Sequence, residues 1–160
     1  MTLDRDRLLE CLRIERWADS LTPLEPASVD ELVAAAMVAA TPLTDADVAE
    51  ALTAHPRIGE RHAGTGAEAK LSASEQASSQ SDDATLAERL AAGNAAYDAR
   101  FERVFLIRAA GRDRQQIVDE LERRLANDDA TESAEVAEQL RQIAELRLRS
   151  VFSYLDEEHA

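Results

Sequence analysis

Three histidines, His55, His62 and His159, are the side chains of this sequence most readily poised for proton transfer near neutral pH. His159 is the second-to-last residue, where chains usually fray, and His62 falls in a glycine-containing stretch where solvent exposure is the ordinary outcome. His55 differs because it ends an expected helix and precedes Pro56, which disfavours helical geometry in the residue before it. A helix C-terminus favours the imidazolium form, so His55 either donates a proton or only caps helix-end carbonyl groups.

A second polar group, Ser72, Glu75 and Gln76, follows the first two histidines. In the S-x-x-E spacing, the serine side chain binds the backbone amide three residues on, and the glutamate reaches back to the serine amide. The same spacing occurs at Ser28 and Glu31, where the start of a helix explains the motif and no catalytic role is needed. Taken alone, the group therefore predicts a helix that begins near residue 72.

A third candidate, Arg147, stands on the apolar side of the helix expected near the C-terminal end. With Ile143 as zero and about 100° per residue, Leu140 falls at about 60° and Arg147 at about 40°. Arg149 falls at about 240°, on the opposite face. A buried guanidinium is costly unless it meets a carboxylate or lines a cavity. Two interpretations stay open: its head reaches solvent or a structural glutamate, or it binds a substrate carboxylate.

Other kinds of chemistry find little support in the sequence. His55, Glu60 and His62 are close together, yet no spacing places two of them on one helical face as in H-E-x-x-H, so no metal site is expected. No phosphate-binding loop, dinucleotide-binding G-x-G-x-x-G or nucleophile elbow occurs. The single cysteine, Cys11, stands among apolar residues, so we expect it in the core and expect no internal disulfide.

The elements that must position these residues are all expected to be helices. Capping residues, prolines and glycines mark their ends more clearly than the weak hydrophobic periodicity does. Residues 56–71 are expected to form the longest loop, and Gly111 is expected to close a long helix. The sequence predicts one all-α domain over residues 1–160, with about seven or eight helices. The expected helices cover about residues 3–19, 28–40, 44–54, 72–78, 84–108, 113–126 and 131–154.

The composition is that of an acidic globular protein. The chain has 160 residues, of which 45% are hydrophobic and 31% charged, and its net charge is −14. The electrostatic field of this net negative charge repels phosphate backbones and anionic membrane surfaces. No nucleic-acid or membrane partner is therefore expected. The longest apolar stretch, residues 32–40, is too short to span a bilayer, and the charged start of the chain lacks the apolar region of a signal peptide. With a single cysteine as well, a cytoplasmic protein is the expectation.

The candidate residues are also part of an ordered set of motifs. His55-Pro56-Arg57-Ile58-Gly59-Glu60 is followed by Glu75-Gln76, then by Asn94-x-x-Tyr97-x-x-x-Phe101, Arg124-Leu125-Ala126-Asn127 and Leu146-Arg147-Leu148. In order and spacing, this set resembles the 2-oxo-4-hydroxy-4-carboxy-5-ureidoimidazoline (OHCU) decarboxylases of urate degradation. The resemblance covers nearly the whole chain, from about residue 8 to residue 152.

The resemblance implies an all-α enzyme without a cofactor, usually a homodimer, that converts OHCU to (S)-allantoin and CO₂. His55 matches the family's catalytic histidine, Glu75 its partner carboxylate and Arg147 the arginine of the last helix. Leu71 departs from the pattern, which has an aromatic residue at that position, so one wall of the pocket is expected to differ in shape. The positions that match substrate contacts are Pro56, Ser72, Gln76 and, through the backbone, Ile107 to Gly111.

Two alternatives to this enzyme are left open. A helical interaction module without catalysis fits the acidic composition and the capping interpretation of the S-x-x-E motif. A decarboxylase of another ureido or imidazolone substrate would use the same residues. Convergence of His55, Glu75 and Arg147 on one concave site would exclude the first alternative, and substrate profiling would decide the second. Whether His62 or Arg57 contributes to substrate binding or catalysis also stays open.

The net charge of −14 is unfavourable for an anionic substrate such as OHCU. Remote charges act over only about 8–10 Å at ordinary salt, so nearby arginines can offset the overall charge. The arginines that could do so are Arg57, Arg108, Arg112 and Arg147.

Overall fold

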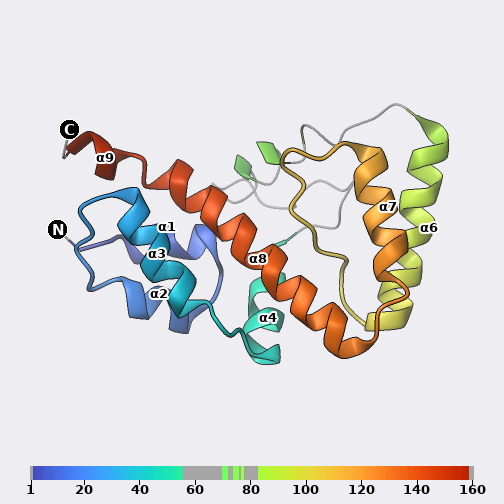
Figure 1. The fold of residues 1–160 in the computed structure, drawn as a ribbon, viewed down its shortest axis with the longest axis horizontal. Coiled ribbons are helices and arrows are strands. Elements are labelled where there is room, and N and C mark those ends of the chain that lie inside the picture. The colour runs from blue at the N-terminus through green and yellow to red at the C-terminus, as the bar shows by residue number, and fades with distance from the viewer. Residues whose placement is uncertain (1, 56–69, 72–73, 76, 78–82, 159–160) are drawn as a thin grey trace. The chain divides into compact units, whose positions relative to one another are not determined.

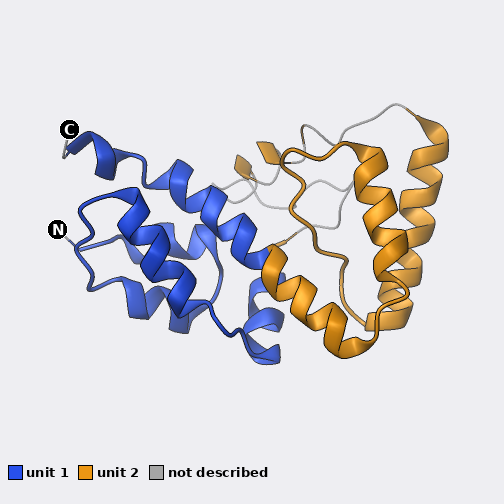
Figure 2. Ribbon diagram, viewed as in Figure 1, with its two compact units in different colours: residues 1–54, 140–160 blue, residues 55–139 orange. Residues whose placement is uncertain are grey.

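The computed structural model describes residues 2–55, 70–71, 74–75, 77 and 83–158 (Figure 1). Within them the chain forms eight α-helices and no strand, so the predicted all-α fold is confirmed. The chain divides into two compact units, one of residues 1–54 and 140–160 and one of residues 55–139 (Figure 2). The single domain expected over residues 1–160 stays a prediction.

The first unit is a group of helices around large apolar side chains. Its helices are α1 (Arg5–Cys11), α2 (Glu15–Leu21), α3 (Val29–Ala39), α4 (Asp45–Leu52), the C-terminal part of α8 (Asp129–Val151) and α9 (Tyr154–Glu158). Trp17 and Phe152 are fully buried, and the Trp17 indole Nε1 donates a hydrogen bond to the Ala36 carbonyl oxygen at 3.0 Å. Ser28 caps α3 as predicted, because its hydroxyl accepts from the Glu31 amide at 3.1 Å.

The single helix expected over residues 3–19 is wrong, since the structure has two helices there, α1 and α2. Between them Leu12 and Ile14 have φ angles of −152° and −131°, and both side chains are fully buried. On a continuous helix, residues two apart point about 200° from each other, so one of these side chains would face solvent. Extended backbone instead puts both on one side and leaves Arg13 exposed between them.

Helix α4 leads to His55, and its start is the predicted one. The Thr44 hydroxyl accepts from the Asp47 amide, and the Asp47 carboxylate accepts from the Thr44 amide, each at 3.0 Å. Asp47 Oδ2 also lies 2.8 Å from Arg16 Nη2, and this hydrogen bond lowers the pKa of the Asp47 carboxyl below its ordinary value. The helix ends at Leu52, slightly before the expected end, and a turn joins it to His55.

The second unit contains α6 (Ala84–Phe101) and α7 (Arg114–Arg124), which lie side by side, and the N-terminal part of α8 (Figure 1). Asp83 caps α6, and Asp113 with Gln116 forms the predicted capping box at the start of α7. In the core, the Tyr97 ring meets the Phe105 ring edge-on, with the ring centroids 5.3 Å apart.

Helices α6 and α7 are in close contact at Gly93, which faces Leu121. A Cβ atom at residue 93 would lie 2.5 Å from Leu121 Cδ2 and 2.9 Å from Leu121 Cγ. Replacing Gly93 by alanine is therefore expected to lower the free energy of unfolding by about 1–3 kcal/mol through overpacking, although alanine is the better helix former. Urea unfolding followed by circular dichroism measures the change.

The matched control for this packing is Ala92→Gly, at the exposed position beside Gly93 on the same helix. That change removes helix propensity alone, and we expect it to cost about 1 kcal/mol. A Gly93→Ala variant as stable as the wild type would mean that the helices separate readily, contrary to the close contact.

The helix expected over residues 84–108 is wrong beyond Phe101, where α6 ends. Glu102 adopts the left-handed conformation with a φ of 56°, and the chain after it is not helical until α7. Residues 105–107 are each buried, whereas on a helix three consecutive residues span about 200°, wider than the apolar face of a surface helix. Gly111, expected to close the helix, lies instead in a turn with a φ of 80°.

The last expected helix, residues 131–154, both begins and ends earlier than predicted. Helix α8 starts at Asp129 because Asp128, rather than Thr131, is its cap: the Asp128 carboxylate accepts from the Thr131 amide at 2.7 Å. The helix ends at Val151, and α9 follows as a separate helix.

Most of the loop expected over residues 56–71, and the helix start expected at Ser72, lie outside the described residues. Lys70 and Leu71 are helical, so the loop ends before the expected residue. None of the helices described here is long and apolar enough to cross a membrane.

Candidate active site

His55 and Glu75, the expected acid/base and its partner, both belong to the unit of residues 55–139. His55 follows the turn after α4, Glu75 is in a helical segment, and both side chains are half-buried. Such a setting allows a titratable group to reach a substrate while it is partly shielded from bulk water. The pairing of His55 with Glu75 stays a prediction. Pro56, Ser72 and Gln76, the substrate contacts expected beside them, lie outside the described residues.

Arg147 occupies the face of α8 that the helical geometry predicts. Its side chain is buried, with 2% of the residue exposed, and Nη1 donates a hydrogen bond to the Glu10 carbonyl oxygen at 3.2 Å. Arg149 is exposed and pairs with Asp30 and Glu145 at 2.7 and 3.1 Å. The Arg147 guanidinium therefore does not reach solvent, and its expected role toward a substrate stays a prediction.

The segment from Ile107 to Gly111, expected to offer its backbone to the substrate, is held by side chains of α7 and α8. The carbonyl oxygen of Leu106 accepts a hydrogen bond from Arg124 Nη1 at 2.7 Å. The amide of Arg108 donates to Gln139 Oε1 at 2.8 Å. Ile107 is buried, and Gly111, at the other end of the segment, is exposed.

A buried ion pair between Arg124 and Glu132 supports this segment. The two residues are 1% and 0% exposed, and Arg124 Nε donates to Glu132 Oε1 at 3.0 Å, while Nη2 donates to Oε2. The guanidinium also lies over the Phe105 ring, with Cζ 4.6 Å from the centroid. Glu132 further accepts from the Tyr97 hydroxyl and from Asn127 Nδ2. Burial and the neighbouring Glu132 carboxylate raise the pKa of the Tyr97 hydroxyl, which therefore stays protonated as a donor.

Arg124 belongs to one of the motifs, but its burial is not among the sequence predictions, although the spacing of apolar residues on its helix indicates it. Ile117, Leu121 and Arg124 follow one another at the spacing of a single helix face, and the first two are fully buried. The helical-face argument that identifies Arg147 thus applies equally to Arg124. Glu132 gives no such signal, because a glutamate in the first turn of a helix is expected at the surface.

Arg108 and Arg112, two of the arginines expected to offset the acidic net charge, lie close together. Arg112 Nε donates to the Arg108 carbonyl oxygen at 2.9 Å. Burial, and then the nearby Arg108 charge, lower the pKa of the Arg112 guanidinium from its ordinary value, although it remains a cation at neutral pH. Positive charge is therefore concentrated beside the Ile107–Gly111 segment. Arg57 lies outside the described residues.

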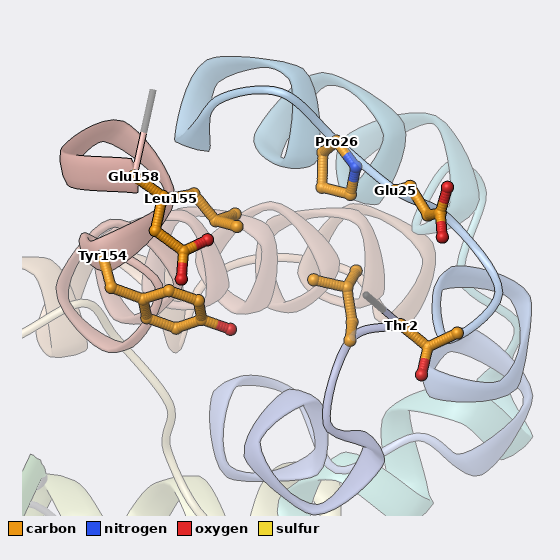
Figure 3. Close-up of a pocket in the computed structure, with 7 residues that line it drawn as sticks. Thr2, Glu25, Pro26, Tyr154, Leu155 and Glu158 are labelled. Carbon is orange, nitrogen blue, oxygen red and sulfur yellow. The ribbon is translucent and has the colours of Figure 1, made fainter. Parts of the chain in front are cut away.

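A pocket of about 280 Å³ in the first unit does not contain the predicted site (Figure 3). Its lining includes Thr2, Glu25, Tyr154 and Glu158, and among the described residues that line it there is no predicted catalytic or substrate-contacting residue. Across the described ranges, no group of three or more His, Cys, Asp or Glu side chains is arranged to hold a metal ion.

The all-α fold together with the family comparison gives the class of protein, a helical decarboxylase. The family profile described as OHCU decarboxylase matches residues 4–149, which is most of the chain. The chain therefore belongs to the OHCU decarboxylase family, and the predicted family membership is confirmed.

A solved structure agrees with this family. Seven chains match, and one of them is described as a crystal structure of OHCU decarboxylase in the presence of (S)-allantoin. It has a TM-score of 0.79 and 25% sequence identity, over 94% of this chain and 99% of that chain. No curated protein matches this sequence.

Proposed function

We propose that this chain converts OHCU to (S)-allantoin and CO₂, with His55 as the acid/base. The observation that carries the proposal is the family match over residues 4–149, a span that includes His55, Glu75 and Arg147. The burial of Arg147 on the apolar face of α8 supports it, because a guanidinium out of water is suited to bind an anionic group. The proposed reaction uses no metal or cofactor.

The reaction breaks the bond between a ring carbon and its carboxylate. The electron pair of that bond passes into the ring as CO₂ leaves, which gives an enolate-like species, and a proton must then reach the ring carbon that carries the ureido group. His55 in its imidazolium form supplies this proton, and Glu75 favours and orients the imidazolium. Because the proton arrives from one fixed side, one hand of allantoin is formed.

The remaining residues bind and orient the substrate. Arg147 holds an anionic oxygen and fixes the ring, which contributes positioning more than affinity. Ser72 and Gln76 bind the ureido and ring amide groups, whose donors and acceptors need partners when buried. Pro56 and the backbone of Ile107 to Gly111 complete the contacts. The charges of Arg108 and Arg112 offset the acidic net charge near this segment.

The proposal extends to the state of the protein in the cell. We place it in the cytoplasm, as a homodimer, because the family resemblance implies a dimer and the sequence has a single, buried cysteine. Light scattering of the purified protein tests the dimer directly. A mass of one chain, 17.5 kDa, would overturn that part of the proposal and leave the reaction unaffected.

The test of the reaction is circular dichroism of the allantoin formed when the purified protein meets freshly generated OHCU. OHCU also decays unaided to racemic allantoin, so the expected result is faster product formation with growing optical activity of the (S) hand. Racemic product at the spontaneous rate would overturn the proposal and favour the non-catalytic interaction module. Turnover of another ureido or imidazolone compound in place of OHCU would favour the related decarboxylase.

A further inference from the structure

Two side chains hold the peptide groups on either side of Ile107. Arg124 Nη1 donates to the Leu106 carbonyl oxygen at 2.7 Å, and Gln139 Oε1 accepts from the Arg108 amide at 2.8 Å. Both contacts lie within the unit of residues 55–139. The peptide groups before and after Ile107 are therefore each fixed from one side by a side chain.

This arrangement determines where the backbone groups of Ile107 point. In a planar trans peptide the C=O and N–H groups point in opposite directions. The N–H of Ile107 is therefore directed away from Arg124, and its C=O is directed away from Gln139. Among the described residues neither group has a hydrogen-bond partner, although Ile107 is only 3% exposed. A buried donor and acceptor that the described part of the chain leaves without partners can each be satisfied by a bound ligand.

Of the two side chains that hold these peptide groups, Arg124 is buried and has further contacts, and Gln139 is half-buried. Arg124 is locked by its hydrogen bonds to Glu132 and by the Phe105 ring beneath its guanidinium. Gln139 is half-buried on α8, one residue before the fully buried Leu140. Neither residue is exposed on the surface, and the two hydrogen bonds favour one direction of the Ile107 groups before any ligand binds.

We propose that Arg124 and Gln139 are positioning residues, which aim the backbone N–H and C=O of Ile107 at the ureido group of the substrate. A ureido group carries C=O and N–H groups together, so it supplies the missing acceptor and the missing donor. This inference rests on the proposed function for the identity of the ligand. It adds two residues that do not touch the substrate but decide how its ureido group is recognised.

The test uses substitutions of Gln139, because Arg124 also supports the fold. Gln139→Met keeps the size of the side chain and removes the acceptor, whereas Gln139→Glu keeps an acceptor oxygen. We expect Gln139→Met to raise the KM for OHCU about ten-fold, with kcat changed less than about three-fold, and Gln139→Glu to stay near the wild type. The matched control is Gln115→Met, at an exposed glutamine of α7 whose amide donates to Asp119.

A second readout is independent of turnover: hydrogen exchange of the Ile107 amide, with and without (S)-allantoin. We expect (S)-allantoin to slow exchange at Ile107 in the wild type and not in Gln139→Met. Equal KM values and equal protection in both proteins would overturn the inference, as would a parallel loss of kcat and thermal stability, which would indicate a structural role. Protection at Ile107 without OHCU turnover would overturn the proposed reaction and leave this inference standing.

Discussion

Replacing His55 by alanine is expected to slow OHCU decarboxylation by about 10²–10⁴-fold and to leave a racemic product. The substitution removes the group proposed to deliver a proton from one side of the ring, so rate and handedness should be lost together. The measurement is the initial rate of allantoin formation combined with its circular dichroism. A variant that kept the wild-type rate and the (S) product would remove His55 from the mechanism.

The same substitution is expected to leave the fold intact. His55 lies after the end of α4, and the helix is stabilised at its other end by the Thr44–Asp47 capping box. Far-UV circular dichroism and the urea midpoint should therefore match those of the wild type. His159→Ala is the matched control, with no expected effect on the rate. A second variant, His62→Ala, decides whether His62 contributes to the rate of decarboxylation.

Local signals predict a large part of the fold because they act over a few residues. Ser28, Thr44 and Asp113 each cap the helix that their spacing predicts. The burial of Arg147 and the exposure of Arg149 likewise follow from the angular position of each residue on one helix. Caps and helix faces depend on residues that are close together in the sequence, so a single sequence contains the information needed to predict them.

The errors arise where long-range packing overrides local preference. Leu12 and Ile14 leave helical geometry because both can then be buried, and the chain after Phe101 does so because residues 105–107 are buried together. Helix propensity in these segments is ordinary, so propensity gives no warning of a break. The error at the start of α8 does not come from long-range packing. Asp128 and Thr131 are both good N-cap residues only three positions apart, and the structure uses Asp128.

The candidate site is less predictable than the fold because it depends on residues far apart in sequence. Helical geometry places Arg147 on an apolar face, but no periodicity in the sequence relates it to His55 or Glu75. The support of the Ile107 segment is of the same kind, since Arg124 and Gln139 reach it from two different helices. For this reason the catalytic assignments rest on family membership, which carries three-dimensional information that spacing alone does not.

Replacing Glu132 by alanine is expected to lower the free energy of unfolding by about 3–5 kcal/mol. The substitution leaves the Arg124 guanidinium buried without its counter-charge, and it removes the acceptor of the Tyr97 hydroxyl. Urea unfolding followed by circular dichroism measures the loss. Replacing the pair together, Arg124→Met with Glu132→Leu, should recover much of it, because neither residue then leaves an unpaired charge in the core.

The matched control is Glu135→Ala, which breaks an ion pair between the same two helices at the surface. Glu135 Oε1 lies 2.6 Å from Arg123 Nη2, and the Arg123 side chain is 52% exposed, so this loss should be about 1 kcal/mol or less. Equal costs for Glu132→Ala and Glu135→Ala would contradict the view that burial makes it costly to remove one partner of the Arg124–Glu132 pair.

The Glu132→Ala variant also tests whether the chain is a single domain, as its sequence predicts. Trp17 is the only tryptophan, it is fully buried, and it belongs to the unit of residues 1–54 and 140–160, whereas Glu132 belongs to the other unit. If the chain unfolds as one cooperative domain, Trp17 fluorescence and far-UV circular dichroism should shift by the same amount in urea. A Trp17 transition that stayed at the wild-type midpoint, while the circular dichroism lost part of its signal earlier, would mean that the units unfold separately. The continuous helix α8, which contributes residues to both units, is the physical reason to expect a single transition.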